Sequence, residues 1–111
     1  MELAHLDDAP GHDPDGPVVA LLVGGEQFNA RTIRLATGQK VPEHAHDQSE
    51  VTLLVVEGTP TLRKTSDEQA ESTELTPGSV ISFDVGEVPF VANHGDEGVT
   101  LVAYFAPPWP S

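Results

Sequence analysis

Two histidines separated by one residue, His44 and His46, are the strongest sign of chemistry in this sequence. On a strand both side chains point to the same face, about 6.6 Å apart along the chain, and two imidazoles can converge on one ion. Glu50 has the same parity, but on a straight strand it would lie about 13 Å beyond His46. It joins the pair only if the chain turns between them, and residues 47–49 (Asp-Gln-Ser) have a composition suited to such a turn.

Two histidines and a carboxylate on one face, with open positions, form the arrangement of non-haem Fe(II) sites, which also suits Zn, Mn and Ni. The sequence therefore predicts a divalent transition metal (Fe, Mn, Ni or Zn) bound by His44, His46 and Glu50 and completed by water or substrate. The alternative is that both histidines form hydrogen bonds inside a pocket that holds no metal. No catalytic residue is assigned, because no nucleophile triad or glycine-rich phosphate loop accompanies the histidines.

The composition restricts the partners. The chain has 111 residues, enough for one domain, and its 5 basic and 18 acidic residues give a net charge of −13. Such a charge repels phosphate backbones and anionic membranes, so we expect neither nucleic acid nor membrane as a partner. Without cysteine, and with neither a secretory signal at the start nor a run of ~20 apolar residues, the sequence predicts a cytoplasmic protein.

Short β-rich runs separated by glycine and proline turns predict an all-β domain, and no segment has apolar residues at helical spacing over three turns. The expected strands are 18–23, 28–35, 51–56, 59–64, 80–83, 89–93 and 99–105. The polar and acidic residues 65–74 are expected to form an exposed hairpin tip.

Three regions follow from this pattern. Residues 1–17 read as an acidic, flexible N-terminal arm, in which His5 and His12 are expected to be solvated. Residues 18–106 form the barrel, and residues 107–111 form a proline-rich C-terminal tail.

Several of these residues resemble the two motifs of the cupin family. The first motif is matched by Gly38, His44-Ala45-His46, Glu50 and Gly58, and the second by Pro77-Gly78, Gly86 and Asn93. The resemblance implies a single jelly-roll β-barrel, often dimeric, with a divalent metal inside.

The second motif departs from the family pattern. Pro89 stands where cupins place their last metal-binding histidine, and Asp84 replaces the usual proline before Gly86. His94 lies nearby, but on a regular strand its parity is opposite to that of Pro89 and it faces away. A bulge would be needed to bring it back.

The spacing of the first motif also departs from the pattern. Seven residues separate Glu50 from Gly58, one more than usual. Counted forward from His46, the carboxylate ligand is Glu50; counted back from Gly58, Val51 takes that place. Residues 51–56 are nearly all apolar, so alternation does not decide between the two registers.

Two further pairs of charged residues are candidates for the site. Arg31 and Arg34 are expected on opposite faces of one strand, so one of them can reach the pocket mouth and pair with an anionic substrate group, unless both lie on the surface. Asp84 and Glu87 are expected to be solvated rather than a catalytic pair.

The sequence leaves three functions open. The first is a metal-dependent oxygenase or isomerase acting on a small organic ligand held in the barrel. The second is a non-catalytic small-molecule-binding or sensor protein without a working metal site, and the third is a purely structural barrel. The apolar run 18–23 can pair across a two-fold axis, so we expect a homodimer.

Overall fold

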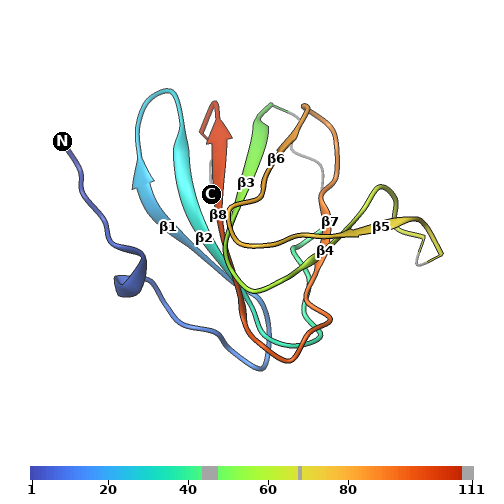
Figure 1. Cartoon of the computed structure of the whole chain (residues 1–111). Helices are drawn as coiled ribbons and strands as arrows, with labels where there is room; N and C mark the ends of the chain where they lie inside the picture. The colour runs from blue at the N-terminus through green and yellow to red at the C-terminus, as the bar shows by residue number, and fades with distance from the viewer. Residues whose placement is uncertain (44–47, 68, 109–111) are drawn as a thin grey trace.

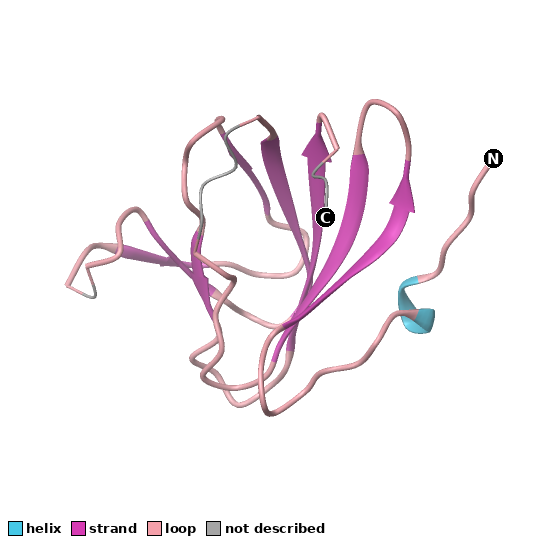
Figure 2. Ribbon diagram, turned by 180° about the vertical axis from the view of Figure 1, so that it is seen from behind, coloured by secondary structure: helices cyan, strands magenta, loops and turns pink. Residues whose placement is uncertain are grey.

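The computed structural model describes residues 1–43, 48–67 and 69–108. The strands are β1 Val18–Gly24, β2 Asn29–Leu35, β3 Glu50–Glu57, β4 Thr61–Arg63, β5 Ser72–Glu74, β6 Val80–Phe83, β7 Phe90–Ala92 and β8 Val99–Ala106 (Figure 1). The helical structure within these residues is one 3-10 turn, Leu6–Asp8 (Figure 2). This confirms the all-β class. No helix in the described part is long and apolar enough to cross a membrane.

The strands form two antiparallel sheets. The large sheet has the order β1-β2-β8-β3-β6 and the small sheet the order β5-β4-β7, and the two face each other as in a jelly roll (Figure 1). β5 is the strand that the sequence did not predict, since it lies within the expected hairpin tip. All three of its residues are exposed, so no apolar alternation marks it.

One face of the large sheet carries the hydrophobic core, and we call it the interior face. Side chains alternate along a strand, so every second residue lies on this face. Its buried hydrophobic members are Ile33, Leu35, Val51, Leu53, Val55, Phe83, Val99, Leu101, Ala103 and Phe105. Val91 of the small sheet, with Val41 and Leu75, completes the core, and the partly buried Leu62 and Ile81 pack against it.

The antiparallel register groups the interior residues into rows across the sheet, because opposite residues share a face. The first row is Asn29, Phe105, Val51 and Phe83, and the second is Arg31, Ala103, Leu53 and Ile81. β2 begins and β6 ends at the first row, and β3 begins and β8 ends one residue beyond it. We call this part of the barrel the Asn29 end.

The motif glycines form turns. Gly38, Gly58, Gly78 and Gly86 are the glycines with positive φ among the described residues. Gly58 also lies close to its neighbours: a Cβ there would be 2.7 Å from the carbonyl oxygen of Gly98 and 2.8 Å from Cγ2 of Val99. Only glycine meets both the φ of +86° and this close approach without a shift of the backbone.

Asn93 joins three parts of the chain from a buried position. Its Nδ2 donates to the carbonyl oxygens of Leu35 (3.1 Å) and Glu97 (2.8 Å), and its Oδ1 accepts from the backbone N–H of Gly95 (3.0 Å). Its own backbone N–H donates to the carbonyl of Gln39 at 2.8 Å. The asparagine of the second motif therefore shapes the turn before β8 and fixes that turn to the end of β2.

The N-terminal arm lies against the barrel. Arg34 donates from Nε to the carbonyl oxygen of Pro10 (2.9 Å) and from Nη2 to that of Leu6 (2.8 Å). Gln39 Nε2 donates to the carbonyl oxygen of Asp13 at 2.7 Å. An arm of this composition is predicted to be flexible, and these bonds are among those that hold it to the barrel, as is the bond from the Gly24 N–H to Oε1 of Glu2 (2.8 Å).

The two histidines of the arm differ. His5 is exposed, as expected. His12 is exposed as well, and its Nε2 in addition lies 2.9 Å from the carbonyl oxygen of Val99, with its ring against Gly98. No local pattern indicates this contact, because Val99 is 87 residues away from His12 in the chain.

Candidate functional site

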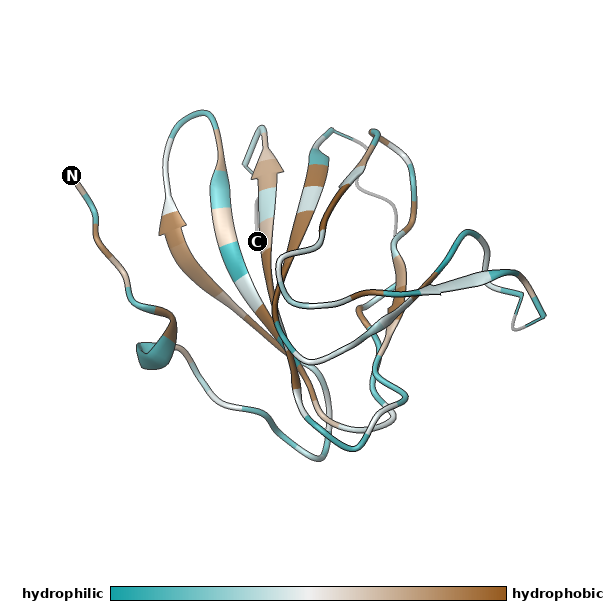
Figure 3. Ribbon diagram, in the orientation of Figure 1, coloured by the Kyte–Doolittle hydropathy of each residue, from teal (hydrophilic) through white to brown (hydrophobic). Residues whose placement is uncertain are grey.

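The interior face is apolar except near the Asn29 end. Asn29 and Arg31 lie on it with exposed fractions of 6% and 9%, opposite Phe105 and Ala103. Figure 3 shows hydrophilic bands along β2, while β1 beside it is mainly hydrophobic. Among the described residues, Arg31 is the one charged side chain that is buried.

Arg34 lies on the other face of β2. Its Nη1 donates to Oγ1 of Thr100 (3.1 Å), and the hydroxyl of Thr100 donates to Oε1 of Glu57 (3.2 Å). The expectation that Arg31 and Arg34 point to opposite faces of one strand is confirmed. Arg34 binds the N-terminal arm, and Arg31 lies on the interior face.

The register of β3 separates Glu50 from the core. Glu50 is the first residue of β3 and is exposed, whereas Val51 is 3% exposed and lies between Phe105 and Phe83. The interior face of β3 therefore starts at Val51. This is the residue that takes the ligand position of the first motif when the motif is counted back from Gly58. Glu50 lies at the Asn29 end but on the alternate side of the strand.

The metal site is only partly covered by the described residues. His44 and His46 lie outside them, so a metal bound by these histidines stays a prediction. Within residues 1–43, 48–67 and 69–108, no three histidine, aspartate or glutamate side chains meet to hold an ion. The prediction that Glu50 joins the two histidines therefore stays a prediction as well.

The second motif contributes no imidazole to the interior. Pro89 is buried just before β7, at the position of the last cupin histidine. His94 follows β7 and is exposed, in agreement with its expected parity.

Asp84 and Glu87 are exposed, as expected, and form a turn between β6 and β7. The Asp84 N–H donates to Glu87 Oε1 (2.8 Å), and the Glu87 N–H donates to the carbonyl oxygen of Asp84 (3.0 Å). These two hydrogen bonds stabilise the turn.

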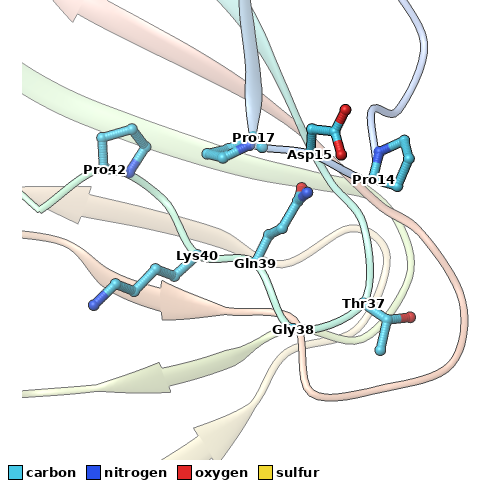
Figure 4. A pocket seen from close by; sticks show the side chains of 9 residues that line it. Pro14, Asp15, Pro17, Thr37, Gly38, Gln39, Lys40 and Pro42 are labelled. Atoms are coloured by element: carbon cyan, nitrogen blue, oxygen red, sulfur yellow. The ribbon is translucent and has the colours of Figure 1, made fainter.

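A groove that sequence reasoning missed lies outside the barrel, between the arm and the residues after β2 (Figure 4). Pro14, Asp15 and Pro17 line it from the arm, and Gln39, Lys40 and Pro42 line it from the barrel. Gln39 bonds the arm, and Lys40 Nζ pairs with Glu43 Oε2 at 3.1 Å. Gln39 therefore belongs to the junction between arm and barrel, while Lys40 and Glu43 pair within the segment that follows β2.

Comparisons with known proteins agree with this architecture. A model of the cupin domain matches residues 31–105. The protein TT1209 of Thermus thermophilus has a TM-score of 0.83 at 22% identity, over 98% of this chain and 100% of that chain. An RmlC-like cupin of Desulfovibrio desulfuricans has a TM-score of 0.80 at 22% identity, over 98% and 99%.

A Klebsiella pneumoniae protein with a double-stranded β-helix domain has a TM-score of 0.84 at 19% identity, over 96% of this chain and 90% of that chain. Likeness at these identities speaks for the fold alone. No protein with curated annotation matches the chain. The matched segment runs from Arg31 to Phe105, across both motifs and the strands that form the core. The chain therefore belongs to the cupin family, and its all-β domain is a single cupin-type jelly-roll barrel.

Proposed function

We propose that this cupin binds a small organic molecule between its two sheets, at the Asn29 end of the barrel. The observation that carries the proposal is the pair Asn29 and Arg31, two buried polar side chains on an otherwise apolar interior face. Ligand sites in proteins have this composition: mostly apolar walls with a few placed polar groups. The proposal is a binding function and assigns no reaction.

Two neighbouring leucines of β3 test the proposed location. Leu53 lies on the interior face and is 1% exposed, and Leu54 lies on the alternate face. A screen of small organic molecules by methyl NMR should yield binders that shift the Leu53 signals and leave those of Leu54 unchanged. Binders that shift Leu54 alone would place the site on the outside of the sheet and contradict the proposal.

A second candidate function, a metal-dependent oxygenase or isomerase, is favoured by the spacing of His44 and His46. Two imidazoles would hold a divalent cation with open positions for water or ligand, and the ion would act as Lewis acid or redox centre. Fewer protein ligands give weaker binding, so the ion would be exchangeable. Turnover, or oxygen uptake with ferrous ion, would distinguish this candidate from a binding protein.

We predict that protein made without a histidine tag or chelator binds up to about one equivalent of Fe, Mn, Ni or Zn through its histidine pair. Replacing both His44 and His46 by alanine should remove this metal, as measured by elemental analysis after incubation with each ion. The matched control replaces His5 and His94, which are exposed. Equal metal in all three proteins would exclude the histidine pair as the site.

We also propose that the chain forms a homodimer through β1. β1 is an edge strand of the large sheet, and Leu21 on it is 57% exposed. An edge strand presents unpaired N–H and C=O groups, and a second copy would satisfy them and cover this apolar side chain.

Light scattering should therefore give twice the chain mass of 11.8 kDa. Leu21→Glu should convert the dimer to a monomer, because it places a charge in the apolar contact. Val80→Glu is the control, since Val80 is 64% exposed on β6, the other edge of the sheet. A monomeric wild-type protein would refute the dimer.

A further inference from the structure

The free edge of the large sheet lies beside the N-terminal arm. β1 pairs with β2 on one side, and Figures 1 and 2 show the arm running past its other side. The strand itself, Val18–Gly24, contains no charged residue, in a chain whose net charge is −13. Two copies of so acidic a chain repel each other, so an uncharged edge is the place where they approach most easily.

The arm has two parts that are held differently. Residues 6–13 are bound by Arg34 of β2, by Gln39 after β2 and by the carbonyl oxygen of Val99 in β8. None of these three groups belongs to β1. We call residues 1–5 the tip, because this part of the arm lies beyond those anchors and can move while they hold.

The tip binds the open side of β1. Within the part of the chain that the structure describes, one hydrogen bond joins the tip to the barrel, from the Gly24 N–H to Oε1 of Glu2 at 2.8 Å. The next N–H along the strand, that of Gly25, donates to the carbonyl oxygen of Phe28 at 2.9 Å. Successive N–H groups of a strand point to opposite sides, so the Gly24 N–H points away from β2. Glu2 therefore places its oxygen where a neighbouring strand would place a carbonyl.

The tip covers this edge without filling the space beside it. A gap of about 330 Å³ lies between the arm and β1, and its lining includes Leu3 and Ala4 of the tip and Leu21 and Leu22 of β1. Leu21 stays 57% exposed and Leu3 stays 93% exposed. The cover therefore buries little apolar surface, and a strand that packs against these leucines would gain more from burial.

We infer that the tip is a displaceable cover of the β1 edge, and that β1 of a second copy takes its place when the homodimer forms. This inference rests on the proposed homodimer and names what regulates it. Glu2 opposes pairing in two ways: it occupies the Gly24 N–H, and its carboxylate brings negative charge to a strand that has none of its own. Charged side chains on an edge strand are a common means of preventing pairing between copies.

Backbone NMR of the wild-type protein over a dilution series tests the exchange directly. As the dimer forms, the order parameters of residues 2–5 should fall below about 0.6, the range of flexible backbone, while residues 6–13 stay ordered. Order in the tip that is the same in monomer and dimer would overturn the inference. This measurement needs no variant.

Variants of Glu2 measure how strongly the tip opposes the dimer. Glu2→Ala removes both the acceptor and the charge, and should lower the dissociation constant of the dimer by about fivefold or more, because two tips are displaced for each dimer. Glu2→Gln keeps an acceptor and should lower it less. Glu71→Ala is the control: Glu71 is exposed between β4 and β5 of the small sheet, and its replacement removes the same charge elsewhere.

Sedimentation velocity over a range of protein concentrations gives these constants. An unchanged or weaker dimer in Glu2→Ala would overturn the inference while leaving the homodimer in place. Equal tightening by Glu71→Ala would also overturn it, since the effect would then come from net charge alone. If all these proteins were monomeric at every concentration, the homodimer and the inference would both fail.

Discussion

Replacing Asn93 by alanine should lower the free energy of unfolding by about 3–5 kcal/mol. The side chain is 1% exposed and forms hydrogen bonds with Leu35, Glu97 and Gly95. Alanine would leave three backbone groups without their partner, at about 1–3 kcal/mol for each buried group. Domains of this size are usually stable by about 5–15 kcal/mol, so the variant should be near the limit of folding.

Urea denaturation followed by circular dichroism measures this effect. Ser82→Ala is a suitable control, because Ser82 is exposed on β6 and its loss should change stability by less than about 0.5 kcal/mol. A loss below about 1 kcal/mol for Asn93→Ala would show that water replaces its hydrogen bonds, and the role assigned to this residue would be wrong.

Replacing Val51 by glutamate should make the stability of the barrel depend on a metal. Val51 is 3% exposed between Phe105 and Phe83, so an unpaired carboxylate there should cost about 3–5 kcal/mol. If His44 and His46 bind an ion, the new carboxylate supplies a third ligand from the interior face. A metal concentration one hundred times the Kd would then restore about 2.7 kcal/mol.

Thermal melting with and without Zn²⁺ or Mn²⁺ measures this dependence. Glu50→Gln is the matched control: Glu50 is exposed, so its replacement should leave both the melting temperature and the response to metal unchanged. A larger metal response in wild-type protein than in Val51→Glu, abolished by Glu50→Gln, would instead support Glu50 as the ligand predicted from the sequence.

The ambiguity between Glu50 and Val51 shows why the sequence alone could not define the site. The run from Val51 to Val56 is almost uniformly apolar, so either parity gives a plausible interior face. The register is decided by pairing with Phe105 of β8 and Phe83 of β6, which are distant in the sequence.

Other features were predictable because they depend on local pattern. Arg31 and Arg34 are separated by an odd number of positions, which predicts that they lie on opposite faces of the strand. The turns that contain glycine and proline mark the ends of most strands. β5 was missed because Ser72–Glu74 has no buried residue. The contact of His12 was missed because its partner, Val99, is 87 residues away.

The hydrogen bonds that hold the arm determine which of its residues can be substituted. Arg34 and Gln39 bind the arm through the carbonyl oxygens of Leu6, Pro10 and Asp13, which every amino acid carries. Recognition through these three carbonyl oxygens depends on the path of the backbone and not on the side chains at Leu6, Pro10 and Asp13. These three positions can therefore change and still dock, provided that a donor is kept at the positions of Arg34 and Gln39, whereas Glu2 and His12 contact the barrel through their side chains.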